Sequence, residues 1–396
     1  MKKTNLDQWI SELEGIPELT REKLEALQLR RLNALLARAR ESKLHYETLP
    51  EKLDSLAQLR ELPFTTADMI ARQPGRYLLT SQSEVARVIS GATSGTTGPA
   101  KRVFYTERDT EHTVGLFMAG ISEMARPGEK VYIGMPFSGP FGLGDLIAKA
   151  VERLRAVPIR AGIGLTWGQQ KELMEAERPE NFIGFPVPLL GLARFCGDGF
   201  PLRRALVSGD ACPAGVMAEL ERLFPVYPHY GSREMGLGGA VTCPAHEGMH
   251  LRENHVLAEI VDERGAPLPD GQWGELVITT IGLEAMPLIR YRTGDRARFL
   301  AEPCPCGGVT RRLDRVSRLD PGAVDMEEWD SRLFRLPQLV DYHAARSETG
   351  FRIRAAVTGE IGAREIRNAL GIDAEITVSV CHKDDKPFYP AKRYVQ

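Results

Sequence analysis

The sequence lacks a charge imbalance, a cysteine framework and a long apolar run. Its 396 residues carry 51 lysines and arginines against 53 aspartates and glutamates, so we expect no general attraction to nucleic acid or to an anionic membrane. Six cysteines are too few for a disulfide scaffold in a chain of this length. No segment approaches the roughly 20 apolar residues of a spanning helix, and the N-terminus lacks the apolar stretch of a secretion signal. We therefore expect a soluble, cytoplasmic protein in which any anion site is local.

Apolar runs divide the chain into regions with different patterns. Leucines at helical spacing between residues 22 and 46 predict an amphipathic packing helix. Short apolar runs alternate with helical stretches from residue 131 to residue 225, which predicts an α/β layer with a parallel sheet. Shorter β runs after residue 251 predict a β-rich subdomain. We therefore predict an α/β protein with a large N-terminal domain, residues 1–312, of parallel or mixed sheets plus that subdomain, and a small α+β C-terminal domain, residues 313–396.

A glycine-rich segment, SGATSGTTGPAKR at residues 90–102, combines small hydroxyls and one lysine without Walker spacing. Gly95 and Gly98 allow a tight turn that brings backbone N–H groups close to an anion, and Lys101 adds positive charge. Four side chains offer hydroxyl donors: Thr93, Ser94, Thr96 and Thr97. Because short apolar runs flank the segment, it is better interpreted as a phosphate-binding loop than as a flexible linker.

Three motifs occur in the order found in the acyl-adenylate-forming superfamily. They are the SGTTG loop, YGSRE at residues 230–234 and YRTGD at residues 291–295. Within this superfamily the chain resembles the phenylacetate-CoA ligase family in LQLRRLNALLARARES, LPFTT, YGSREMG and GMHL near His250. The resemblance implies a ligase that uses ATP, Mg²⁺ and CoA to convert a carboxylic acid into an acyl-adenylate and then a thioester.

The resemblance also implies roles for individual residues. The SGTTG loop with Thr97 would hold the ATP phosphates, Glu234 would bind magnesium, and Asp295 would accept hydrogen bonds from the ribose hydroxyls. The transition state is anionic and needs such positive charge and N–H donors. The other nucleotide-binding positions would be Ser208, Gly209, Asp210, Tyr230, Gly231 and Ser232. Taken alone, Glu234 could instead be a salt-bridge partner of Arg233, and Asp295 a turn aspartate.

The C-terminal segment KPFYPAKRYVQ contains Lys392 where the family has its mobile catalytic lysine. We favour Lys392 over Lys386 for this role, while a solvated terminal lysine is the alternative. Arg315 would match the hinge arginine of the family. The hinge aspartates appear here as Ser317 and Arg318, and the small domain looks shortened. This departure puts the second half-reaction, the formation of the thioester, in question, because in the family that step uses a rotation of the small domain.

Cysteines and histidines form two close pairs. Cys243 and His246 form a C-x-x-H pair, and Cys304 and Cys306 form a C-P-C pair. Four such ligands suit a tetrahedral structural zinc with no open position for chemistry. His250 competes with His246 for the fourth position, and unligated packing cysteines are the alternative interpretation.

The acyl pocket has the weakest signal. Apolar and turn residues could line it: Phe137, Phe141, Gly142, Phe185 and Met235. They suit a small aromatic or short branched acid, although the aromatic residues could equally belong to the core. No cationic residue in these loops would pair with a second carboxylate, so a dicarboxylate is less favoured.

Two other functions remain open from the sequence. The acyl group could pass to a carrier-protein thiol or to an amine, because the ATP site would be the same. The altered hinge motivates a non-catalytic nucleotide-binding protein or sensor, whereas the retained Lys392 argues against it. Relatives often dimerise, so a homodimer is also open.

Overall fold

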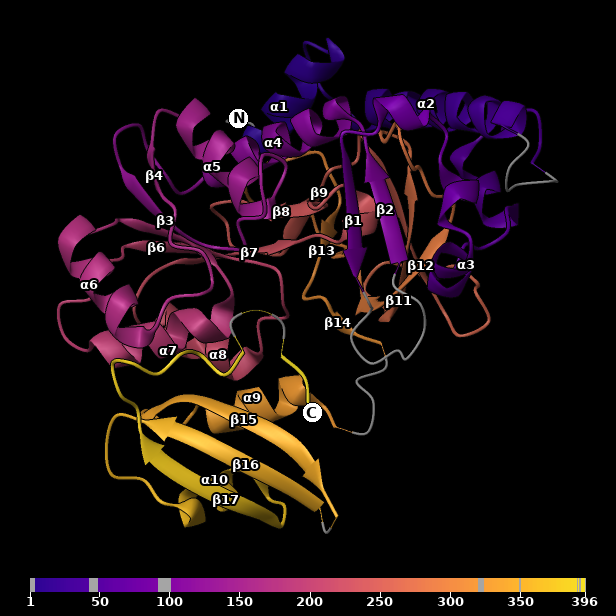
Figure 1. Cartoon of the computed structure of the whole chain (residues 1–396). Helices are drawn as coiled ribbons and strands as arrows, with labels where there is room; N and C mark the ends of the chain where they lie inside the picture. Colours follow the sequence, from indigo (N-terminus) through magenta and orange to yellow (C-terminus); the bar gives the residue numbers. More distant parts are fainter. Residues whose placement is uncertain are drawn as a thin grey trace. The chain divides into compact units, whose positions relative to one another are not determined.

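The computed structural model of the chain describes residues 4–42, 49–91, 101–319, 324–348, 350–389, 391 and 393–395. Two compact units are present, each made from two separate stretches of sequence. The first comprises Met1–Glu123 and His229–Asp320, and the second comprises Met124–Pro228 and Pro321–Gln396. Helices and strands of both are labelled in Figure 1. The predicted α/β class is confirmed.

A parallel sheet with helical connections forms the first stretch of the second unit. Its strands are β3 (Lys130–Gly134), β4 (Val157–Ile159), β5 (Asn181–Gly184), β6 (Arg204–Val207) and the start of β7 (Val226–Tyr230). They pair in parallel in the order β4–β3–β5–β6–β7. The connecting helices are α5 (Leu143–Arg153), α6 (Trp167–Glu177), α7 (Pro186–Cys196) and α8 (Ala214–Glu221). All four residues of β5 are buried, as expected for a strand covered on both faces.

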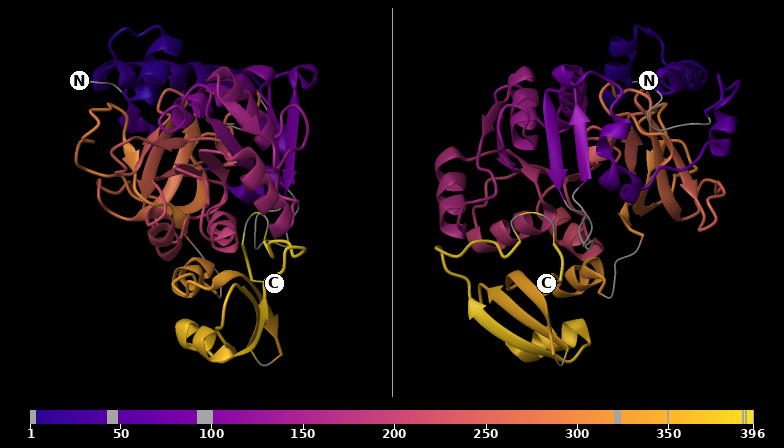
Figure 2. Two further views of the ribbon diagram at one scale, coloured as in Figure 1. Left: turned by 90° about the vertical axis from the view of Figure 1, so that its left-hand side faces the viewer. Right: turned by 45° about the vertical axis from the view of Figure 1, so that its right-hand side comes forward.

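The C-terminal stretch of this unit is α+β. Its elements are α9 (Met326–Leu333), β15 (Leu339–Ser347), β16 (Gly350–Val357), α10 (Ala363–Leu370) and β17 (Ala374–Val380). Strands β15 and β16 are antiparallel, whereas β16 and β17 are parallel and are joined through α10. Figure 2 shows α9 and α10 on one face of the three-stranded sheet. One hydrophobic cluster contains side chains from β6, α7, β15 and β16, so both stretches of the unit share a core.

The first unit contains antiparallel sheets and the N-terminal helices. The predicted β-rich part is the sheet β10–β11–β12–β14, and the end of β7 continues into β8, β9 and β13. Their bounds are β8 (Ala240–Thr242), β9 (Met249–Leu251), β10 (Val256–Val261), β11 (Gly274–Thr280), β12 (Tyr291–Ala297), β13 (Arg312–Leu313) and β14 (Ser317–Arg318). Strands β1 (Arg87–Gly91) and β2 (Lys101–Tyr105) form a separate antiparallel pair.

Helices of the first unit come mainly from its N-terminal stretch. The α-helices are α1 (Asn5–Glu14), α2 (Arg21–Ser42), α3 (Ala67–Arg72) and α4 (Glu107–Ile121). The 3₁₀ turns are η1 (Leu56–Glu61), η2 (Pro74–Tyr77), η3 (Gln82–Glu84) and η4 (Arg233–Met235). The amphipathic helix predicted over residues 22–46 corresponds to α2 as far as Ser42, with most of its leucines buried, and residues 43–46 lie outside the described part.

The expected domain boundary at residue 313 falls inside the first unit. Strand β13 pairs with β9, and β14 pairs with β12. Residues 313–319 therefore belong to the first unit. The division into domains 1–312 and 313–396 stays a prediction.

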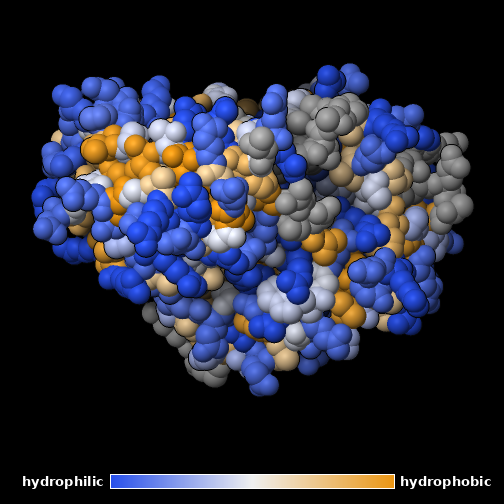
Figure 3. All heavy atoms as spheres, turned by 90° about the horizontal axis from the view of Figure 1, so that it is seen from below, coloured by the Kyte–Doolittle hydropathy of each residue, from blue (hydrophilic) through white to orange (hydrophobic). Residues whose placement is uncertain are grey.

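Hydrophilic side chains predominate on the face drawn in Figure 3, with hydrophobic side chains gathered in separate patches. Among the described helices, none combines the length and the apolar composition that crossing a membrane requires.

Candidate functional site

A buried ion pair lies at the YGSRE motif in the first unit. Glu234 is on η4, and its Oε1 atom pairs with the ammonium of Lys101, the first residue of β2. Lys101 Nζ also donates to the hydroxyl of Tyr291 at 2.8 Å. Glu234 and Lys101 are each only 5% exposed. The partner of Glu234 is thus Lys101, the residue that we predicted to add positive charge to the phosphate-binding loop.

The Glu234 carboxyl is held in its ionised form. Burial raises its pKa, but the Lys101 charge and hydrogen bond act in the opposite direction, and the pKa is lowered overall. An ionised carboxylate is a ligand type that Mg²⁺ prefers, usually together with phosphate oxygens of a substrate. The side chain therefore fits a magnesium ligand once the ammonium releases it.

The backbone around Glu234 explains the glycines of the motif. A Cβ atom on Gly231 would lie 2.5 Å from the carbonyl oxygen of Leu237, so only glycine allows this approach. Gly236 ends η4 with φ 76°, in the left-handed region. Ser232 precedes η4, and its carbonyl accepts from the N–H of Leu237 at 2.9 Å. The local sequence thereby forms the turn that holds Glu234.

A second polar group in the same unit surrounds Asp295 on β12. The Tyr230 hydroxyl donates to Asp295 Oδ2 at 2.8 Å, and Arg318 Nη1 donates to Oδ1 at 2.9 Å. Asp295 and Arg318 are direct cross-strand partners of β12 and β14. An ionised carboxylate is an acceptor of the type that two neighbouring hydroxyls can share. Arg315, expected at the hinge, is exposed.

Residues 208–210, the expected adenine loop, follow β6 in the second unit. Gly209 has φ 87°, and a Cβ atom there would lie 2.6 Å from the ring of Phe185. Asp210 Oδ2 accepts from the backbone N–H of Arg393 at 2.9 Å. This loop is thus hydrogen-bonded to the C-terminal segment of its own unit.

Arg393, which sequence reasoning missed, anchors that segment. Its Nε lies 3.1 Å from both carboxylate oxygens of Asp330, and its Nη1 lies 2.8 Å from Asp341 Oδ1. All three side chains are buried. Burial raises the pKa of Asp330 to about 6 even though Arg393 lowers it. The signal in the sequence was only a basic residue next to Lys392, and its carboxylate partners are more than fifty positions away.

The expected acyl-pocket residues separate into two groups. Phe137 lines a cavity of about 580 Å³ in the second unit, together with Arg160, Ile163 and Leu165. Five other residues complete its wall: Pro136, Asp145, Ala161, Gly162 and Gly164. Met235 is buried in the core of the first unit, where 0% of its surface is exposed.

The assignment of Met235 to the substrate therefore stays a prediction, with its side chain packed in this core. Phe185 is also buried, and it packs against Gly209. Phe141 is half-buried beside Gly142, the residue that precedes α5.

A cation that does not come from the predicted loops also lines this cavity. Arg160 lies 5.4 Å from the Phe137 ring centroid and pairs with Asp145 at 3.1 Å. Because Arg160 comes after β4 and not from the predicted loops, only the tertiary structure places it here.

Several predicted residues lie outside the described part of the chain. These are Thr93, Ser94, Gly95, Thr96, Thr97, Gly98 and Lys392. Their roles stay predictions.

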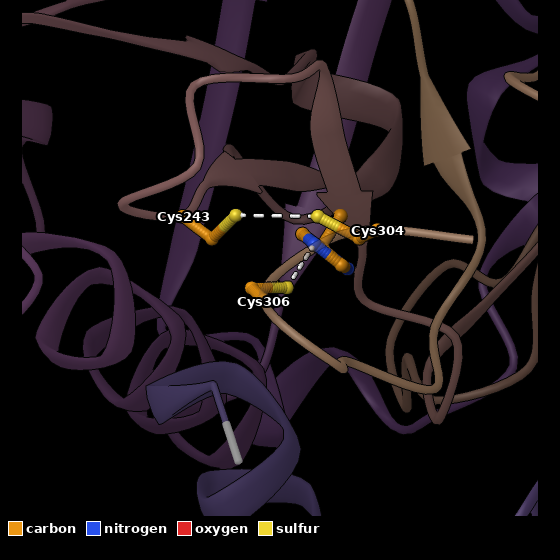
Figure 4. Close-up of side chains that lie close together, drawn as sticks. Cys243, Cys304 and Cys306 are labelled. Carbon is orange, nitrogen blue, oxygen red and sulfur yellow. Dashed lines mark hydrogen bonds between the residues drawn. The ribbon is translucent and has the colours of Figure 1, made fainter. Parts of the chain in front are cut away.

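Three cysteines and one histidine meet in the first unit. The ligand atoms of Cys243, His250, Cys304 and Cys306 lie within 4.8 Å of one another. Figure 4 shows the three cysteine side chains pointing toward a common centre. The Sγ atoms of Cys243 and Cys304 are 3.6 Å apart, and Cys306 Sγ is 3.3 Å from His250 Nε2. The arrangement fits a tetrahedral metal ligand set.

His250, and not His246, is the histidine of this group. His246 lies in a tight turn with φ 55°, where its N–H donates to the Cys243 carbonyl at 3.0 Å. His250 is on β9, with Nδ1 3.2 Å from the Thr310 carbonyl, which leaves Nε2 facing Cys306. Burial lowers the pKa of His250 to about 4, so the ring is neutral and able to ligate.

Sequence comparisons identify relatives over most of the chain. Residues 80–285 match the family described as AMP-binding enzyme. The chain is 32% identical over 325 residues to the phenylacetate-coenzyme A ligase of Thermus thermophilus, across 77% of this chain and 72% of that protein. It is 30% identical over 337 residues to the phenylacetate-coenzyme A ligase of Escherichia coli, across 80% and 75%.

A solved structure shows the same fold. The 2-hydroxyisobutyryl-CoA ligase in its postadenylation state aligns with a TM-score of 0.77 and 20% identity, over 96% of this chain and 90% of that one. The family match covers more than half of the sequence and includes Lys101 and Glu234. The chain therefore belongs to the AMP-binding enzyme family, as the resemblance of its motifs implies.

Proposed function

We propose that this chain is an ATP-dependent, AMP-forming acid–CoA ligase. The observation that carries this proposal is the similarity to phenylacetate-coenzyme A ligases over about three quarters of each protein. The buried, ionised Glu234 and the Asp295–Tyr230 pair supply the groups that such a reaction needs. We place the reaction in the cytoplasm, where ATP and CoA are available.

Two steps make up the proposed reaction. A carboxylate oxygen of the acid attacks the α-phosphorus of ATP, and the bond to the β-phosphate oxygen breaks to release pyrophosphate. The thiolate of CoA then attacks the acyl carbonyl, and AMP leaves with the oxygen it shared with the acid. Magnesium supplies positive charge at the phosphates when bound.

Residues of this chain position the reactants. Glu234 would hold the magnesium, and Asp295 would accept from the ribose hydroxyls and so fix the nucleotide. Lys392 would bring positive charge to the α-phosphate, and the SGTTG loop with Thr97 would donate N–H and hydroxyl groups to the phosphates.

The acid is proposed to be small and aromatic or short and branched. The cavity beside Phe137 supports this, since an aromatic ring and Ile163 and Leu165 line it. Arg160 does not change the preference, because Asp145 already pairs with its charge.

A structural zinc is also proposed, held by Cys243, His250, Cys304 and Cys306. Their convergence and the neutral His250 ring support it. A full set of four protein ligands would leave no open position, so the metal would stabilise and not catalyse.

Transfer to a carrier-protein thiol or an amine is the second candidate, and a non-catalytic nucleotide-binding protein is the third. The altered hinge, with Ser317 and Arg318 in place of the aspartates of the family, is the feature that favours the third. The test is pyrophosphate release with ATP and magnesium against aryl, arylacetic, hydroxy and short branched acids, with and without CoA. Release with CoA consumption supports the ligase. Release without CoA consumption supports another acceptor, and ATP binding with no release supports the binder.

A further inference from the structure

Lys101 already occupies the carboxylate that the proposed function assigns to magnesium. Its ammonium pairs with Glu234 Oε1, and the two side chains are 7% and 6% exposed. The Tyr291 hydroxyl accepts a second hydrogen bond from the ammonium at 2.8 Å. Three elements of one unit, β2, η4 and β12, therefore hold the pair.

A second cation at this carboxylate would be strongly disfavoured. Like charges a few ångströms apart in a poorly solvated site repel each other far more than in water. A buried ion pair that loses one partner also leaves the other charge uncompensated. The ammonium and a divalent ion are thus expected to exclude each other from Glu234.

We propose that Lys101 is the resident cation of the magnesium site. In the nucleotide-free protein Lys101 neutralises Glu234, and magnesium reaches this carboxylate only together with a nucleotide, whose phosphates offer the ammonium a new partner. The long, flexible stem of lysine allows such an exchange. The proposal rests on the proposed function, since it assigns Glu234 to magnesium.

The exchange would couple the metal to the nucleotide. Magnesium alone would not load the site, and the released ammonium would add its charge to the phosphates in the same step. Lys101 would then fill both roles that the chain offers it, first as counter-ion of Glu234 and then as phosphate ligand.

The test measures Mn²⁺ binding to the nucleotide-free full chain by electron paramagnetic resonance. Lys101→Met removes the ammonium and should tighten Mn²⁺ binding by about tenfold to a hundredfold over the wild type. Lys101→Arg keeps a cation and should bind as weakly as the wild type. The double variant K101M/E234Q should lose this increase in Mn²⁺ affinity. Tyr291→Phe keeps both charges and should bind Mn²⁺ as weakly as the wild type.

Two results would overturn the proposal. One is equal Mn²⁺ affinity of the wild type and Lys101→Met, with thermal melts showing that both are folded. The other is a gain that persists in K101M/E234Q. Lys101→Gln serves as a second uncharged variant if the methionine variant does not fold. No acid, CoA or turnover is needed, so a failed ligase assay and a failed Mn²⁺ measurement remain distinguishable.

Discussion

At the residue scale, Glu234 combines two interpretations that the sequence left as alternatives. It is a salt-bridge partner, but of Lys101 and not of Arg233. It is also a buried ionised carboxylate of the kind that binds magnesium beside phosphates. Both interpretations apply if magnesium replaces Lys101 at Glu234 when the nucleotide binds.

Glu234→Gln should lower kcat for adenylation by about a hundredfold or more, since it removes a charged group that stabilises the transition state. Pyrophosphate release across a range of magnesium concentrations measures this. Glu175→Gln, an exposed surface change in the second unit, is the matched control. A Glu234→Gln enzyme with unchanged kcat and magnesium dependence would contradict the assignment.

Asp295→Asn should raise KM for ATP by about tenfold, because the amide loses charge-assisted bonds to hydroxyls. Initial rates at varied ATP give KM and kcat separately. Tyr230→Phe removes the hydroxyl that donates to Asp295 and should have a smaller effect of the same sign. If only kcat changes, Asp295 does not hold the ribose.

At the element scale, the C-terminal segment depends on one buried ion network. Arg393 lies between Asp330 and Asp341, and its N–H reaches Asp210 after β6. Because Lys392 is the preceding residue, the network fixes the chain next to the proposed catalytic lysine.

The network should make stability depend on pH. The pKa of Asp330 is raised from 3.8 to about 6 by burial, so the folded state binds this proton more tightly than the unfolded state. The stabilisation from protonated Asp330 is complete below about pH 4 and is lost as pH rises through about 6. The difference in unfolding free energy between wild type and Asp330→Asn should therefore fall by about 2 kcal/mol between pH 4 and pH 7.

Urea unfolding of both proteins at several pH values between 4 and 7 checks this prediction. Asp373→Asn, at a fully exposed carboxylate near the start of β17, should show no such change. A constant difference between wild type and Asp330→Asn would show that Asp330 does not titrate in this window.

At the scale of the whole molecule, the cysteine group joins segments far apart in the sequence. Cys243 follows β8, His250 is on β9, and Cys304 and Cys306 precede β13. A metal bound there would cross-link the first unit, and its binding free energy would add to folding stability.

Elemental analysis should find about one zinc per chain, and removal by a chelator should lower Tm. His250→Ala should lose the zinc, whereas His246→Ala should keep it. Cys196→Ser is a control at a cysteine outside the group. Zinc retained in His250→Ala but lost in His246→Ala would restore the ligand set expected from spacing.

Lys392→Ala should abolish adenylation but leave CoA transfer from preformed acyl-adenylate largely intact, because the lysine is needed only where charge develops at the α-phosphate. Single-turnover assays of each half-reaction measure this. Equal loss of both steps would reject the role.

The sequence by itself determined the family and the α/β class. Local signals were sufficient there: apolar runs that alternate with helical stretches predict β3 to β6, and the order of the three motifs indicates the family. The C-x-x-H spacing favoured His246 as the histidine ligand. In the structure His246 lies in a tight turn, and β9 brings His250 to the cysteines instead.

Only the tertiary structure decided which charges meet. Lys101 and Glu234 are 133 positions apart, and Asp330 and Arg393 are 63 apart. Such partners are chosen by strand pairing and by the cost of burying a charge alone, and neither leaves a pattern along the chain. The same holds for two other pairs. Tertiary packing brings Arg160 next to Phe137, and strand register places Arg318 opposite Asp295.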